Sequence, residues 1–126
     1  MANFQDIAQQ FVDFYYKTFD ADRTQLVALY KQTSMLTFEK EPFQGAQNIV
    51  EKLTNLPFQK VQHRVDTMDA QPSSQEGGIQ VLVTGALMVD DQPQPMSYVQ
   101  TFTILPADGS YYVFNDMFRL VYPAHG

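Results

Sequence analysis

The sequence predicts an α+β fold in which helices come first and a curved antiparallel sheet follows. Apolar residues recur at helical three- and four-residue spacing through the first part of the chain. From Lys60 onward the period changes, since residues 60–71 and 98–105 alternate, 79–89 is β-branched and apolar, and 110–122 is rich in aromatic residues. The links between the alternating runs are short and rich in Pro, Gly and Asp, as in connections between antiparallel neighbours. The 126 residues suit a single domain over 1–126.

Three helices are expected, all before the alternating region. The first runs from Phe4 to about Asp20, with Asn3 as its N-cap, because apolar residues then share one broad face. Asp22 is expected to cap a second, short helix that reaches Tyr30. The third helix is expected from about Ala46 to Thr54, since a proline follows shortly after it and blocks its continuation.

Five strands are expected, and the last four are long. They cover residues 35–39, 60–71, 79–89, 98–105 and 110–122. Gly85 interrupts an otherwise β-branched run and is a candidate bulge or bend. A sheet that curls around helices makes a cone, and a cone leaves a cavity at its open end.

Composition excludes several classes of function. The formal charge is −6, and no Lys or Arg lies between Arg64 and Arg119, so neither nucleic acid nor an anionic membrane surface is an expected partner. The chain has no cysteine, no apolar run long enough to span a membrane and no signal-peptide core, which favours the cytosol or nucleus. The acidic second half either solvates strand ends or forms a surface for a basic partner.

Enzymatic motifs are missing. The sequence has no phosphate-binding glycine loop, no G-x-S-x-G and no histidine pair at metal spacing, so neither a cofactor nor a metal is expected. The carboxylate pairs Glu39/Glu41 and Asp90/Asp91 fall at strand ends or turns, where exposed acids are ordinary. His63 is expected to be a surface or rim residue rather than a catalytic base. The sequence therefore favours a binding protein over an enzyme.

Five segments together resemble the nuclear transport factor 2 family. They are FYYKTFDADRTQL at 14–26, LTFE at 36–39, FQG at 43–45, LPFQKVQH at 56–63 and NDMFRL at 115–120. The resemblance runs from Phe4 to the end of the chain in the family's order. It implies a homodimer packed sheet to sheet, and a carrier that takes GDP-bound Ran into the nucleus. Such a carrier would be found in cytoplasm and nucleus, concentrated at nuclear pores.

The resemblance also implies two binding surfaces. At the cavity rim, an aromatic side chain from switch II of Ran enters the cavity while acidic residues pair with basic residues of Ran. The residues carried over to this rim are Glu39, Asp90, Asp91, His63, Phe38 and Phe118. Gln92 stands where the family usually has a further acid, and the turn is one residue longer here.

The second surface is an apolar strip near the dimer seam that takes the Phe side chains of FxFG repeats in nucleoporins. Phe4, at the start of the first helix, is carried over to this strip. Met117 is carried over to the sheet face that forms the dimer.

Two alternatives share the expected fold. The first is a small-molecule isomerase or dehydratase, like ketosteroid isomerase or scytalone dehydratase, which needs acids or histidine deep in the cavity. Asp20, near the end of the first helix, is the best candidate for such a buried acid. The second is an adaptor domain of the mRNA-export or stress-granule type.

Overall fold

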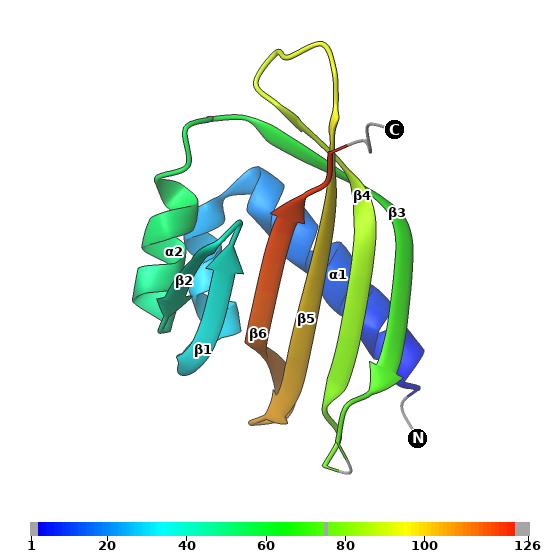
Figure 1. Ribbon diagram of the computed structural model, residues 1–126. Helices are drawn as coiled ribbons and strands as arrows, with labels where there is room; N and C mark the ends of the chain where they lie inside the picture. The colour runs from blue at the N-terminus through cyan, green and yellow to red at the C-terminus, as the bar shows by residue number, and fades with distance from the viewer. Residues whose placement is uncertain (1–2, 75, 123–126) are drawn as a thin grey trace.

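The computed structural model describes residues 3–74 and 76–122 of the chain. Six strands form one sheet in the order β2-β1-β6-β5-β4-β3, and helices cover one of its faces (Figure 1). The elements are α1 (Phe4–Ala21), the 3₁₀ helix η1 (Arg23–Leu29), β1 (Tyr30–Phe38), β2 (Glu41–Gln44), α2 (Ala46–Thr54), β3 (Val61–Pro72), β4 (Ile79–Val89), β5 (Met96–Ala107) and β6 (Ser110–Leu120). This arrangement confirms the predicted α+β class with a curved sheet around N-terminal helices.

The predicted first residues of the helices are confirmed. Asn3 accepts a hydrogen bond from the Gln5 backbone N–H at 2.8 Å and so caps α1. Asp22 likewise accepts from the Thr24 backbone N–H at 3.1 Å, and η1 begins there. The second helix is of the 3₁₀ type and ends one residue earlier than predicted, because Tyr30 is already the first residue of β1.

The first two strands differ from the prediction. β1 begins at Tyr30, five residues before the predicted start at Met35. Residues 31–34 are all polar and show no apolar alternation, so the sequence pattern did not predict a strand there. The register of β1 against β6 shifts between Tyr30 and Met35, and Ser34 donates a hydrogen bond to the Val113 carbonyl. β2 was not predicted, and β1 pairs with β6 in parallel, so the sheet is mixed rather than wholly antiparallel.

The long strands of the second half pair in antiparallel order, as predicted. The register between β3 and β4 shifts between Val65 and Thr67, opposite Gly85. A Cβ at Gly85 would lie 1.9 Å from the Arg64 carbonyl oxygen, so the close approach of the two strands requires glycine. The bulge therefore lies in β3 opposite the predicted glycine, and such bulges bend a sheet.

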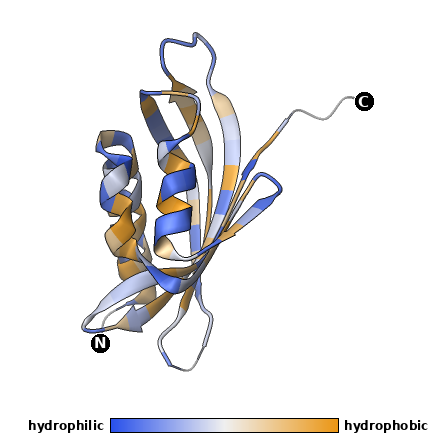
Figure 2. Cartoon of the chain, turned by 90° about the vertical axis from the view of Figure 1, so that its left-hand side faces the viewer, coloured by the Kyte–Doolittle hydropathy of each residue, from blue (hydrophilic) through white to orange (hydrophobic). Residues whose placement is uncertain are grey.

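The core lies between the sheet and the helices. Figure 2 shows α1 and α2 on one side of the sheet, each with hydrophobic residues along it. The largest side chains that are fully buried include Tyr15 from α1, Leu53 from α2 and Phe102 from β5. Because the sheet curves around this layer, the β1–β2 turn, the α2–β3 link and the β4–β5 loop gather at one end of the molecule (Figure 1).

Candidate functional site

An apolar cavity of about 320 Å³ opens at this end, between the helices and the sheet. Side chains from α1, β1, α2, the α2–β3 link and strands β3 to β6 line it. All are apolar except three, which are Tyr15, His63 and Gln100. Its volume lies within the range of small-ligand pockets, so the cavity predicted from the cone geometry is present.

Phe38 and Phe118 form one wall of the cavity, as the sequence predicted. Their rings stack with centroids 4.8 Å apart and planes 9° from parallel. Tyr98 continues the stack behind Phe118 at 5.7 Å. Phe118 is buried and Phe38 is half-buried, so the wall offers an aromatic surface near the cavity mouth.

Glu39 lies in the β1–β2 turn directly after this wall. Its backbone has a left-handed φ of 61°, and its Oε1 accepts the Leu120 backbone N–H at 2.9 Å. Its Oε2 is 3.8 Å from the Arg119 guanidinium, and the side chain is 31% exposed. The carboxylate therefore fixes the end of β6 through one oxygen and presents the other at the rim.

Asp90 ties the β4–β5 loop to the α2–β3 link. Its Oδ1 accepts the backbone N–H groups of Gln59 and Lys60, each at 3.0 Å, and its own N–H donates to the Lys60 carbonyl at 2.7 Å. The N–H groups of Lys60 and Gln59 hold the pKa of the Asp90 carboxyl below its usual value. Asp90 therefore shapes the rim as well as charging it.

Arg23 holds the same link from the helical side. It donates to the carbonyls of Leu53 at 3.1 Å and Phe58 at 2.9 Å, and its guanidinium lies over the Phe58 ring at 5.0 Å. Phe58 also lines the cavity. Arg23 on one side and Asp90 on the other therefore fix the α2–β3 link where it contacts the cavity. No signal in the sequence marked Arg23 for this role, because its carbonyl partners come from another element.

Asp91 is the acid of the rim with the most freedom. It is exposed, and within the described part of the chain its carboxylate makes no hydrogen bond or ion pair. It lines a second hollow together with Asp90, and this hollow shares Leu56, Pro57 and Phe58 with the apolar cavity. The structure thus brings the three predicted rim acids and the two predicted aromatic residues to one end of the cone.

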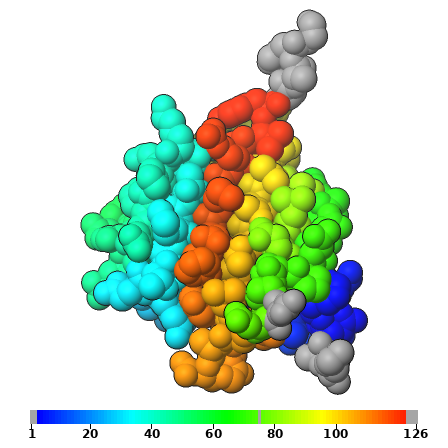
Figure 3. All heavy atoms as spheres, turned by 60° about the horizontal axis from the view of Figure 1, so that its bottom comes forward, coloured from blue at the N-terminus to red at the C-terminus, as the bar shows by residue number. Residues whose placement is uncertain are grey.

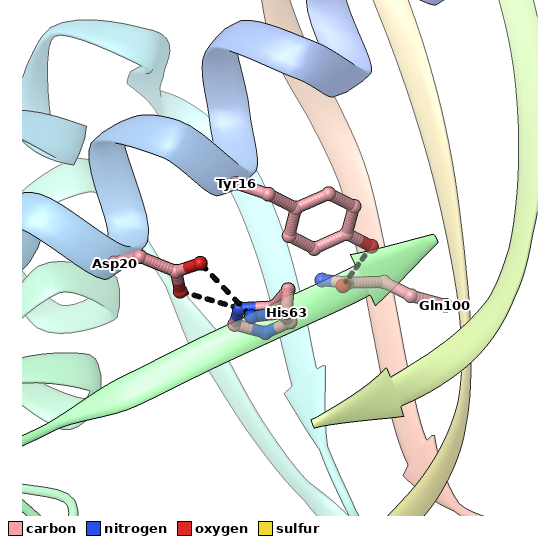
Figure 4. Close-up of polar contacts among 4 residues, drawn as sticks. All are labelled: Tyr16, Asp20, His63 and Gln100. Atoms are coloured by element: carbon pink, nitrogen blue, oxygen red, sulfur yellow. Dashed lines mark hydrogen bonds and ion pairs between the residues drawn. The ribbon is translucent and has the colours of Figure 1, made fainter. Parts of the chain in front are cut away.

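His63, which was expected to be a surface or rim residue, has a buried side chain that lines the cavity. Its side chain is only 4% exposed, and its Nδ1 lies 2.6 Å from Asp20 Oδ1 (Figure 4). Its backbone N–H donates to the other oxygen of Asp20, and its ring stacks on Tyr16 at 4.6 Å. The prediction rested on the strand position beside Arg64, whereas β3 turns His63 inward against α1.

Sequence reasoning missed the most buried acid of the site, Asp116. Its Oδ2 accepts from Tyr30 at 2.7 Å and from Tyr15 at 3.2 Å, and its Oδ1 accepts from Gln100 Nε2 at 2.7 Å. The alternation of β6 contained the signal, because Asp116 and Phe118 are two positions apart in the strand, which puts both side chains on one face. Burial raises the Asp116 pKa to about 6, against its three donors, which lower it.

The two remaining predicted site residues lie away from the cavity. Phe4 is half-buried at the start of α1, at the other end of the molecule from the rim (Figure 1). Met117 is 53% exposed on the outer face of the sheet, which no helix covers in Figure 3. The second histidine, His125, lies outside the described residues.

The described residues contain neither a cluster of metal ligands nor a helix that could span a membrane. No cluster of three or more His, Asp or Glu side chains there could hold a metal ion. None of the helices there has the length and apolar character to cross a bilayer.

Comparison with known proteins identifies the family. The family model for the nuclear transport factor 2 (NTF2) domain matches residues 7–120. The chain is 64% identical to nuclear transport factor 2 of Davidiella tassiana over 98% of this chain and 99% of that protein. It is 62% identical to nuclear transport factor 2 of Emericella nidulans over 98% and 100% of the two chains. The solved structure of nuclear transport factor 2 from Cryptosporidium parvum superposes with a TM-score of 0.88, at 44% identity, over 94% of both chains.

More distant structures share the fold alone. The Mtr2–Mex67 M domain complex of Candida albicans contains a chain of 18% identity with a TM-score of 0.80. A hexachlorocyclohexane dehydrochlorinase superposes with a TM-score of 0.77 at 12% identity. The same fold thus occurs in the Mtr2–Mex67 M domain complex and in a dehydrochlorinase, and fold by itself does not determine function.

The cone and its apolar cavity define an NTF2-like domain. The chain belongs to the nuclear transport factor 2 family. Its close relatives are transport factors, and the chain is a carrier in nuclear transport rather than an enzyme.

The Asp116 network generates a prediction about stability and pH. The folded-state pKa of about 6 exceeds the ordinary value of 3.8, so between these values the folded protein holds a proton that the unfolded chain has lost. The free energy of unfolding should therefore fall as the pH rises from about 4 to about 6, by roughly 2–3 kcal/mol from this group. Urea unfolding at several pH values measures the slope.

Asp116→Asn is the matched control, because an amide has nearly the same shape and does not titrate. Gln100 and the Tyr16 hydroxyl can reverse their hydrogen bonds to accommodate it. The other acids contribute equally to both proteins, so the variant should lack this part of the slope. Identical slopes for the two proteins would show that Asp116 does not titrate in this range.

Proposed function

We propose that the chain carries GDP-bound Ran into the nucleus by binding it at the open end of the cone. The observation that carries the proposal is the apolar cavity with Glu39, Asp90 and Asp91 around its mouth. Membership of the nuclear transport factor 2 family supports the choice of partner. The carrier would move between cytoplasm and nucleus and concentrate at nuclear pores.

The cavity and the acids would do different work in this complex. An aromatic side chain from switch II of Ran would enter against Phe38 and Phe118, where it loses contact with water. Glu39 Oε2, which lies 3.8 Å from the Arg119 guanidinium, and the Asp91 carboxylate would pair with basic residues of Ran and accelerate association. Since Asp90 already fixes the α2–β3 link, its main contribution would be to hold the rim in shape.

Selectivity for GDP would then require no contact with the nucleotide. Switch II occupies a different position when the γ-phosphate is present, and its aromatic residue would no longer reach the cavity. The fixed rim makes this discrimination possible, because a rim held from both sides cannot follow a displaced loop.

Two further surfaces belong to the proposal. Phe4, half-buried at the start of α1, would contribute to an apolar strip that binds FxFG repeats of nucleoporins. The outer face of the sheet would form a homodimer. There Met117 lies between Thr37 and Thr101 in register, and Leu82 follows on the next strand, so the centre of this face carries no charge.

Substitutions at Glu39 test the Ran site. Glu39→Lys places a cation against a basic partner, so we expect the affinity for Ran·GDP to fall at least about tenfold, or roughly 1.4 kcal/mol. Because Lys cannot accept the Leu120 N–H, this variant should also lose about 1 kcal/mol of stability. Glu39→Gln keeps an acceptor and removes only the charge, so it should bind more weakly at unchanged stability. Calorimetry and melting curves measure both effects.

Phe4→Ala separates the two proposed surfaces. It should weaken binding of FxFG peptides and leave the affinity for Ran·GDP unchanged, because α1 begins at Phe4, at the other end of the molecule from the rim. Glu39→Gln should do the reverse.

If a folded Glu39→Lys protein binds Ran·GDP as the natural protein does, the rim acids only solvate the surface and the proposed site is wrong.

Met117→Glu tests the dimer. The residue is exposed in the single chain, so the substitution should leave the fold intact. In a two-fold interface it would bring two like charges together, which costs several kcal/mol. Sedimentation should show a dimer for the natural protein and a monomer for the variant. A natural protein that is monomeric at micromolar concentration would contradict the proposal.

A further inference from the structure

The polar groups that line the cavity differ in whether they are already bonded. Tyr15 bonds to Tyr30 and Asp116, so its hydroxyl has partners. Gln100 accepts from Tyr16 at 2.7 Å and donates to Asp116 at 2.7 Å, so both ends of its amide are used. Neither residue has a strong need for a further partner.

His63 is the polar residue of the cavity that keeps a free ring nitrogen. Both oxygens of Asp20 accept from this residue, one from its backbone N–H and one from Nδ1 (Figure 4). A carboxylate only accepts, so Nδ1 carries a proton, and the Nδ1–H tautomer that this bond selects leaves Nε2 as an acceptor. No hydrogen bond from residues 3–74 or 76–122 reaches Nε2, and His63 lines the cavity.

The rest of the lining defines what could satisfy this acceptor. None of the described lining residues is Lys or Arg, so the cavity offers nothing to a carboxylate or phosphate. The stacked rings of Phe38 and Phe118 favour a flat aromatic group. An apolar cavity of about 150 Å³ accommodates benzene, and this one is about twice that volume.

We propose that the cavity is a binding site for a free, uncharged two-ring aromatic compound with a single hydrogen-bond donor. The rings would lie along the wall formed by Phe38 and Phe118, and the donor would bond to Nε2 of His63. Asp20 is the positioning residue, because its bonds to the ring and to the backbone fix the orientation of the imidazole in the cavity wall.

Indole and 1-methylindole are the probes, since they differ by the N–H alone. Indole should bind the isolated protein with a Kd of order 0.1–1 mM. One hydrogen bond is worth about fivefold, so 1-methylindole should bind about fivefold more weakly. In ¹⁵N spectra, indole should shift the His63 Nε2 resonance in the direction of hydrogen bonding, and 1-methylindole should not.

His63→Phe is the matched variant, because it keeps a ring against Tyr16 and removes the acceptor. It should bind both probes with equal affinity. The comparison of the two probes on the natural protein does not depend on the folding of this variant. Equal affinity for both probes on the natural protein, or no saturable binding at several times the expected Kd, would overturn the proposal.

Competition between indole and Ran·GDP is a further test, and it rests on the proposed function. A ligand in the cavity would occupy the place of the Ran aromatic side chain, so indole should raise the apparent Kd for Ran·GDP in proportion to its occupancy. Indole binding with competition supports both assignments. Indole binding without competition supports the ligand site and overturns the docking of Ran at the cavity.

Discussion

The site depends on the hydrogen bonds that the buried Asp116 carboxylate accepts. This carboxylate lies on β6 and takes hydrogen bonds from α1, β1 and β5, through Tyr15, Tyr30 and Gln100. A buried carboxylate without partners would be costly, so these side chains must stay where they are for the fold to hold. Because Tyr15 and Gln100 also line the cavity, the same bonds that join the helix to the sheet fix the cavity floor.

The rim extends this principle to the open end of the cone. Arg23 and Asp90 hold the α2–β3 link from opposite sides, and Glu39 fixes the end of β6. Two of the acids suggested for recognition, Glu39 and Asp90, thus also bind backbone N–H groups. A rigid rim loses little conformational entropy when a partner docks, which favours fast and selective binding by a carrier.

The sequence predicted those features that depend on neighbouring residues. The N-caps at Asn3 and Asp22 and the limits of β4 follow from local chemistry and alternation, and the structure confirms them. Features that depend on distant residues were missed. Three such features are the parallel pairing of β1 with β6, the bond between His63 and Asp20, and the hydrogen bonds around Asp116. Each joins segments far apart in the chain, so no local pattern specifies it.

Hydrogen–deuterium exchange of the protein with and without Ran·GDP tests most directly whether the open end of the cone is the binding face. The account predicts slower exchange in the β1–β2 turn, the α2–β3 link and the β4–β5 loop, with little change along the centres of β5 and β6. Slower exchange confined to the outer face of the sheet, with these three segments unchanged, would contradict it.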